Sequence, residues 1–157
     1  MRLSLITLFA GVLLCLSSPA HAWCFDEAGA RYHINARLLR AIAVWESALN
    51  PRAIGVNRKD GKILSSDYGL MQINSGQLPR LKRMGIIKSE QDLLTNPCLN
   101  IQIGAWILAQ HLQVCGANWS CLGSYNAGFS PDRESRRQWY SKNVYRKYLQ
   151  LAGDSGR

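Results

Sequence analysis

Acidic residues and metal-binding side chains are scarce in this chain of 157 residues. Ten Asp and Glu residues face nineteen Lys and Arg residues, so the formal net charge is +9 and the surface is expected to be basic. A basic surface favours association with polyanions. The basic residues are scattered and form no nucleic-acid-binding motif, so we expect no nucleic-acid partner. A zinc site would need closer pairs of Cys or His residues, and His33 and His111 show no such spacing, so we expect no zinc site, no other metal and no cofactor.

Long hydrophobic runs are missing after the first residues of the chain. The run from Leu3 to Leu16 follows a basic start and precedes Ala20-His21-Ala22, the small-x-small pattern of a signal-peptidase site. This run is shorter than the ~20 residues that span a bilayer. We therefore expect a cleavable secretory signal peptide at 1–22 and one mature domain at 23–157. The protein is expected in the periplasm, without stable membrane insertion.

Four cysteines follow the predicted signal peptide: Cys24, Cys98, Cys115 and Cys121. An even number of cysteines in an exported domain favours two disulfides, for which three pairings are possible. Only a short loop separates Cys115 from Cys121, so we expect these two to pair locally. That pairing leaves Cys24 to pair with Cys98.

Helical patterns dominate the rest of the chain, which we expect to be a single, mostly α domain with a small β or loop lobe. Turn-forming residues around short apolar pieces indicate a hairpin or irregular lobe over residues 52–66. Residues 69–74 are expected to begin a helix capped by Asp67, and Ser89 to open a capping box before Leu93. The other expected helices span 26–32, 35–46, 79–84, 97–114, 119–125 and 134–151, and Asn35 is expected to cap the second of them.

Glu46 places a carboxylate on an otherwise apolar helix face. The i, i+3, i+4, i+7 positions of this face hold Leu39, Ile42, Ala43 and Glu46. Burial of an ionised carboxylate is costly, so a buried glutamate has a raised pKa unless it finds partners. A raised pKa suits a general acid that works near neutral pH. The alternative is that Glu46 ends its helix and turns outward into solvent.

Three short motifs occur in order: Glu46-Ser47, Gly69-Leu70-Met71-Gln72 and Ser124-Tyr125-Asn126-Ala127-Gly128. Each motif alone is weak, but the ordered set resembles the soluble lytic transglycosylase family over about residues 24–148. The chain looks most like the small accessory transglycosylases of bacterial secretion and conjugation machines. The resemblance implies a lysozyme-like fold and peptidoglycan glycan strands as the substrate. It also suggests components of a secretion, conjugation or pilus apparatus as partners.

The resemblance implies that Glu46 is catalytic, first as acid and then as base, while the 6-hydroxyl of the sugar attacks its own anomeric carbon. The product would be a 1,6-anhydro-muramyl end. Tyr125 would direct its hydroxyl toward Glu46, Gln72 would hydrogen-bond the sugar, and Met71 would either wall the cleft or belong to the core. The implied substrate-binding residues are Met71, Gln72, Tyr125, Asn126 and Tyr140, and the implied supporting residues are Ser47 and Gly69.

This chain departs from larger relatives in two ways that affect Glu46. Many of those relatives carry a serine nine positions after the catalytic glutamate, where this chain has Gly55. The segment between Glu46 and Gly69 is also longer here than the matching segment in those relatives. A hydrolase uses a second carboxylate as base or nucleophile. Asp67 and Asp60 are the candidates for it, and the sequence favours Asp67. A hydrolytic muramidase of the goose-lysozyme type is therefore an alternative, and a non-catalytic basic adaptor that binds peptidoglycan is another.

Overall fold

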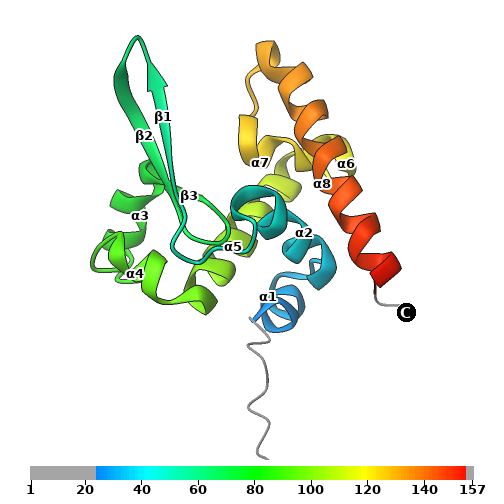
Figure 1. Ribbon diagram of the computed structural model, residues 1–157, viewed down its shortest axis with the longest axis horizontal. Helices are drawn as coiled ribbons and strands as arrows, with labels where there is room; N and C mark the ends of the chain where they lie inside the picture. The colour runs from blue at the N-terminus through cyan, green and yellow to red at the C-terminus, as the bar shows by residue number, and fades with distance from the viewer. Residues whose placement is uncertain (1–23, 155–157) are drawn as a thin grey trace, which may run out of the picture.

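The computed structural model describes residues 24–154, which form a helical body from which a small antiparallel sheet projects (Figure 1). The predicted fold class, mostly α with a small β lobe, is confirmed. The helices are α1 (Phe25–Tyr32), α2 (Ala36–Ser47), α3 (Leu78–Arg83), α4 (Gln91–Thr95), α5 (Pro97–Cys115), α6 (Trp119–Leu122), α7 (Ser124–Ala127) and α8 (Glu134–Asp154), with 3-10 turns η1 (Ser75–Gln77) and η2 (Pro131–Arg133). The predicted signal peptide lies outside the described residues.

Helix α2 carries Glu46 in its last turn. The helix begins where the Asn35 side chain accepts hydrogen bonds from the backbone N–H groups of Arg37 and Leu38, as its predicted capping role requires. The buried residues of α2 pack against α1 and α8. Because the apolar face anchors the helix on two sides, Glu46 has a defined position within the body.

The β lobe is an antiparallel sheet with the order β1 (Ile54–Lys59), β2 (Lys62–Tyr68) and β3 (Ile73–Asn74). The turn between β1 and β2 consists of Asp60 and Gly61, which both have positive φ angles. Two such residues suit the two-residue turns whose twist matches that of a hairpin. The predicted hairpin is therefore present, and Figure 1 shows it extending away from the helices.

The helix expected over residues 69–74 is not formed, so this prediction was wrong. Gly69 and Gln72 have φ angles of 75° and 49°, left-handed conformations that a right-handed helix does not contain. The segment turns instead and then pairs, as β3, with the end of β2. Asp67 consequently lies in β2 and caps no helix.

Two smaller expectations also need correction. The capping box expected at Ser89 forms only in part: the Asp92 carboxylate accepts a hydrogen bond from the Ser89 backbone N–H, as in such a box, and another from that of Lys88, whereas α4 begins at Gln91. The helix expected over residues 119–125 is divided into α6 and α7. The residue between them is a glycine, which is a weak helix former.

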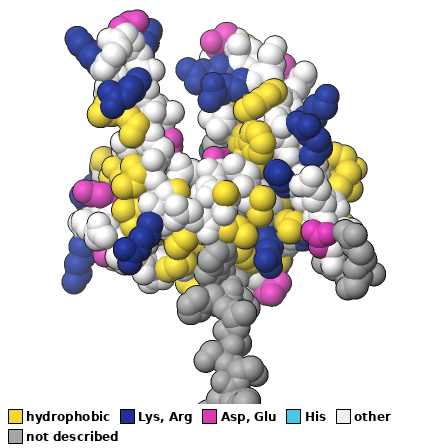
Figure 2. All heavy atoms as spheres, in the orientation of Figure 1, with side chains coloured by type: hydrophobic (Ala, Val, Ile, Leu, Met, Phe, Trp, Pro, Cys, Tyr) yellow, Lys and Arg dark blue, Asp and Glu magenta, His cyan; other side chains and the backbone are white. Residues whose placement is uncertain are grey.

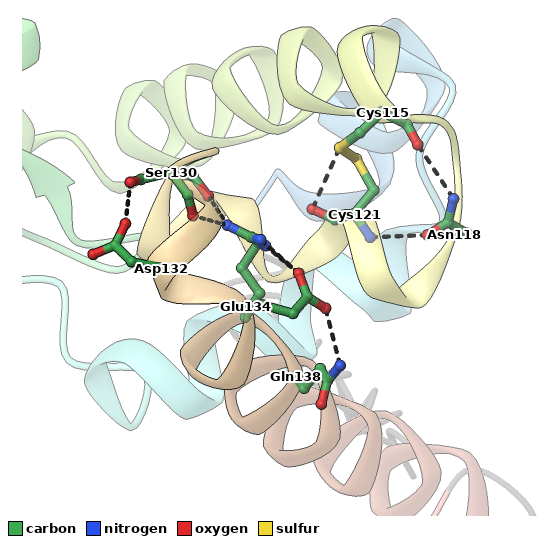
Figure 3. Close-up of polar contacts among 9 residues, drawn as sticks. Cys115, Asn118, Cys121, Ser130, Asp132, Glu134 and Gln138 are labelled. Carbon is green, nitrogen blue, oxygen red and sulfur yellow. Dashed lines mark hydrogen bonds and ion pairs between the residues drawn. A yellow bond between two sulfur atoms is a disulfide. The ribbon is translucent and has the colours of Figure 1, made fainter.

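Both expected disulfides are present. Cys24–Cys98 joins the start of α1 to α5, and Cys115–Cys121 closes the loop between α5 and α6. Figure 3 shows the second disulfide beside Asn118, whose side chain donates to the Cys115 carbonyl and accepts from the Cys121 N–H.

Within residues 24–154, no helix has the length and apolar character needed to cross a membrane, and no group of three His, Cys, Asp or Glu side chains is placed to hold a metal ion.

Candidate active site

A groove of about 440 Å³ lies between the β lobe and the α7–α8 part of the helical body. Figure 2 shows the hollow between these two parts, with acidic side chains near its base. The groove brings together residues from all three sequence motifs and from the hairpin. The lining residues include Glu46, Asn57, Leu64, Asp67, Gln72, Asn74, His111, Tyr125, Asn126, Arg133 and Arg136.

Glu46 is a largely buried carboxyl group at this groove. Burial raises its pKa from 4.5 to about 7. The Tyr140 hydroxyl donates a 2.6 Å hydrogen bond to Glu46 Oε1, which favours the charged form and lowers the pKa, whereas the negative charge of Asp67 raises it. The carboxyl group is therefore about half protonated near neutral pH. The alternative, in which Glu46 turns outward into solvent, is therefore wrong, because the carboxyl group is largely buried and bound by Tyr140.

Tyr140, and not Tyr125, is the tyrosine that hydrogen-bonds Glu46. Tyr125 donates to the Met71 carbonyl oxygen at 2.8 Å, so the expectation that its hydroxyl is directed at Glu46 was wrong. Burial and the nearby charge of Glu46 raise the pKa of both tyrosines well above the usual value. Both hydroxyls therefore stay protonated and act as hydrogen-bond donors, and Tyr125 still lines the groove.

Asp67 is a second carboxylate in the groove. Its two oxygens accept hydrogen bonds from the side-chain amides of Asn57 at 2.6 Å and Asn74 at 2.7 Å, and both amides also donate to Ser65 Oγ. This network fixes Asp67 on the sheet, near enough for its charge to raise the pKa of Glu46. Asp60, in contrast, lies at the exposed hairpin turn. Of the two acids considered from the sequence, Asp67 is the one that acts on Glu46.

Ser47 and Gly69 shape the backbone around the site. Ser47 Oγ lies 2.9 Å from the Leu70 carbonyl oxygen, so this hydroxyl joins the end of α2 to the turn that follows β2. Gly69 has a φ of 75°, and a Cβ atom there would lie 2.3 Å from Asn100 Nδ2. Neither the backbone conformation nor the available space suits another residue type at position 69.

Asn100 organises the same turn, and the sequence analysis missed it. Its fully buried side chain accepts a hydrogen bond from the Met71 N–H at 2.8 Å and donates to the carbonyl oxygens of Tyr68 at 2.8 Å and Leu93 at 3.0 Å. A polar residue next to Ile101 on the apolar stripe of a long helix was the available signal, because a buried amide needs partners. Which partners it finds depends on the packing of α5 against the turn.

Gln72 lines the groove, and part of its amide is used within the protein. Nε2 donates to the Gly69 carbonyl at 2.9 Å and to the Ala53 carbonyl at 3.3 Å. A Cβ atom on residue 55 would lie 2.7 Å from Gln72 Oε1. Gly55, which replaces the serine of larger relatives, therefore leaves the space that this amide occupies.

Met71 and Asn126 differ in their access to the groove. The Met71 side chain is 0 % exposed and packs against Gly104 of α5, so it belongs to the core and its predicted contact with substrate was wrong. Only its backbone serves the site, through the carbonyl that binds Tyr125. Asn126 is exposed and lines the groove, where its Oδ1 accepts a hydrogen bond from Arg136 Nε at 3.0 Å.

Left-handed backbone conformations at non-glycine residues gather around Glu46. Ala48 and Leu49 follow the end of α2 with φ angles of 50° and 61°, and Gln72 has a φ of 49°. Such conformations cost free energy and persist where the surrounding contacts impose them, often at functional sites. The arrangement amounts to one buried carboxyl with a raised pKa, one hydroxyl that donates a hydrogen bond to it, and a second carboxylate held apart on the sheet.

Comparison with known proteins agrees with the resemblance seen in the motifs. The family model described as "Transglycosylase SLT domain" matches residues 23–147. A "Peptidoglycan-binding-like protein" from Escherichia coli O157:H7 is 48% identical over 152 residues, which cover 96% of this chain and 91% of the relative. "Invasion protein IagB" from Salmonella typhimurium (strain SL1344) is 44% identical over 146 residues, which cover 92% of this chain and 88% of the relative.

A solved structure shares the fold. The 70 kDa soluble lytic transglycosylase from Escherichia coli superposes with a TM-score of 0.63 at 28% identity, over 82% of this chain and 24% of that longer chain. The family model covers most of this chain, and the relatives align along nearly their whole length. The chain therefore belongs to the transglycosylase SLT-domain family.

Proposed function

We propose that this protein is a lytic transglycosylase that cleaves the β-1,4 bond between N-acetylmuramic acid and N-acetylglucosamine in peptidoglycan, leaving a 1,6-anhydro-muramyl end. The observation that carries the proposal is Glu46, a groove carboxyl with a pKa of about 7 that accepts a hydrogen bond from Tyr140. Membership of the SLT-domain family supports the reaction class. A pKa near the working pH allows one carboxyl to act as acid and then as base.

In the proposed reaction, protonated Glu46 donates its proton to the glycosidic oxygen while the bond from that oxygen to the anomeric carbon of muramic acid breaks. The sugar left behind has oxocarbenium character. Ionised Glu46 then takes the proton of the 6-hydroxyl, and the 6-oxygen bonds to the anomeric carbon. The steps balance without water and return Glu46 to its protonated form. Tyr140 stabilises the ionised carboxylate between the two proton transfers.

The other groove residues have binding roles in this proposal. Gln72 Oε1, Tyr125 and Asn126 line the groove and would contact the sugars on either side of the scissile bond. Tyr140 is fully buried, so the expectation that it contacts the glycan directly was wrong, and it would act through Glu46. A reaction that uses one carboxyl as both acid and base also requires no metal or cofactor.

The test is digestion of purified sacculi by the wild type and by Glu46→Gln, followed by mass spectrometry of the products. We expect anhydro ends, each lighter by one water than a reducing end, and a rate loss of about 10²–10⁴-fold in the variant. Glu27→Gln, which changes an exposed carboxylate on α1, is the matched control and should stay active. Sacculus clearance by Glu46→Gln at the wild-type rate would point to the non-catalytic adaptor instead.

A hydrolytic muramidase is the second candidate function, and Asp67 is the observation that favours it. Glycosidases that use water employ a second carboxylate near the acid, and Asp67 is fixed in the same groove. Digestion in H₂¹⁸O separates the two reactions, because hydrolysis places one labelled oxygen at the anomeric carbon and attack by the 6-hydroxyl places none. Labelled products that disappear in Asp67→Asn would establish the muramidase.

We also infer that the protein acts in the periplasm, where it would open the wall locally for a secretion, conjugation or pilus apparatus. Two disulfides support an oxidising compartment. The relative "Invasion protein IagB" is named for invasion, and we propose a role beside such an apparatus for this chain as well. Recovery of the protein in the periplasmic fraction, with Trp23 at its N-terminus, is the expected result.

A further inference from the structure

Two arginines of the groove are exposed to solvent. Arg133 ends η2 and Arg136 lies in the first turn of α8, and both line the groove that contains Glu46. Neither forms an ion pair with an acidic side chain within residues 24–154. Arg136 donates one hydrogen bond, from Nε to Asn126 Oδ1, which leaves its two terminal nitrogens available to a ligand.

The neighbouring Arg137 shows how an arginine with a structural role is bound in this region. Its guanidinium donates to the Glu134 carboxylate and to the carbonyl oxygens of Gly128 and Ser130. Figure 3 shows Ser130 and Glu134 in this network, together with the contact between Glu134 and Gln138. The network fixes the loop between α7 and α8, and so it also holds Arg133 and Arg136 on the groove wall.

Arg133 and Arg136 do not account for the raised pKa of Glu46. The main causes of its raised pKa are burial, the Tyr140 hydrogen bond and the charge of Asp67, and no arginine is among them. A guanidinium close to Glu46 would instead lower that pKa by favouring the ionised form. The charge of Arg133 also lowers the pKa of the neighbouring, exposed Asp132, but it forms no ion pair with it. Both arginines line the groove, where their charges suit a negative group on the ligand.

We propose that Arg133 and Arg136 bind carboxylates of the stem peptide carried by muramic acid, so that the groove selects peptide-bearing glycan with free carboxylates. This inference rests on the proposed function, because the glycan must lie in the groove beside Glu46. The N-acetylated sugar rings are uncharged, whereas stem peptides carry free carboxylates. A guanidinium fork matches the two oxygens of a carboxylate and holds them with charge-assisted hydrogen bonds.

The test compares soluble, uncross-linked peptide-bearing glycan strands with the same strands after amidation of their carboxylates. The wild type should show a kcat/KM roughly two- to thirtyfold higher on the untreated strands, since two exposed ion pairs are each worth up to about 1 kcal/mol. Arg133→Gln/Arg136→Gln should bring this ratio close to one, mainly through KM on the untreated strands. Arg83→Gln removes an exposed charge on α3 outside the groove and should keep the wild-type ratio.

The pH profile distinguishes peptide binding from an effect on Glu46. A double variant that keeps the wild-type preference, or that shifts the alkaline limb of activity, would overturn the inference. Equal cleavage of both strands by the wild type would overturn it as well. Binding of both strands to Glu46→Gln, with and without the arginine substitutions, measures the preference without cleavage. The inference is thus tested even if the wild type cleaves neither strand, a result that would count against the proposed function.

Discussion

The Tyr140 hydroxyl lies 2.6 Å from Glu46 Oε1 and joins two residues that are 94 positions apart in the sequence. The bond stabilises the ionised carboxylate, whereas burial of the same carboxylate favours the protonated form. Because the two effects oppose each other, the pKa of Glu46 is near 7 and not higher. The contact between α2 and α8 is therefore the structural basis of the proton transfer proposed for this groove.

Tyr140→Phe should raise the pKa of Glu46 further, because it removes the hydrogen bond that lowers it. Loss of about 1 kcal/mol of stabilisation corresponds to roughly one pH unit, so the alkaline limb of kcat/KM should move upward by about that amount. The rate at the optimum should fall, since the ionised intermediate state loses a donor. A pH–rate profile from pH 5 to 9 measures both effects.

Tyr125→Phe is the matched control for this experiment. Its hydroxyl also belongs to a buried tyrosine but donates to the Met71 carbonyl, so its loss should leave the alkaline limb in place. A limb that moves equally in both variants, or in neither, would contradict the role assigned to Tyr140.

Glu46→Gln should increase the free energy of unfolding at alkaline pH. The pKa of Glu46 is about 7 in the folded state against an unperturbed value of 4.5. Between these two pH values the folded state therefore holds a proton on Glu46 that the unfolded state releases. Its contribution to stability is thus complete below pH 4.5 and is lost as the pH rises through 7, by up to about 3 kcal/mol. Urea unfolding should show the variant to be stabilised at pH 8.5 but almost unchanged at pH 4.5. Equal stabilisation at both pH values would contradict the raised pKa.

Asn100→Ala should destabilise the protein by about 3 kcal/mol, because the buried Met71 N–H and the carbonyls of Tyr68 and Leu93 lose their partner. Activity should fall as well, since these bonds fix the turn that carries Gln72. Asn96→Ala is a suitable control. It removes the cap of α5, which accepts from the Leu99 N–H, and should cost about 1 kcal/mol without loss of activity. Urea unfolding and rates measured at low temperature separate the two variants.

Local sequence signals predicted most of the helices and the hairpin of this fold, but they did not predict which residues of different elements contact each other. Helix α2 follows from its Asn35 cap and its apolar spacing, and the same spacing predicted the burial of Glu46. The turn at Gly69 was mistaken for a helix because its conformation depends on Asn100, a distant residue in α5. Which tyrosine binds Glu46 depends in the same way on how α8 packs against α2, and sequence spacing contains no measure of that packing.

Gly55→Ala should disturb Gln72 more than it disturbs the fold. The added Cβ would lie 2.7 Å from Gln72 Oε1, and this oxygen is the end of a flexible side chain that can rotate away. We expect a stability cost of about 1 kcal/mol and a several-fold loss of kcat/KM, because the amide leaves its orientation. A double-mutant cycle with Gln72→Ala checks this explanation. Gly55→Ala should have little further effect on kcat/KM in that background, and additive losses would show that the contact does not matter.

The two disulfides should differ in their contribution to stability. Cys24–Cys98 closes a much longer loop than Cys115–Cys121, with sequence separations of 74 and 6. The chain-entropy argument then gives losses of about 4 and about 2 kcal/mol when each pair is replaced by alanines. The first pair also anchors the start of α5 close to Asn100, so its removal should reduce activity more than removal of the second. Thermal unfolding and sacculus digestion of the two double variants measure these effects. A wild-type melting temperature that does not change under reductant would contradict a stabilising role for either bond.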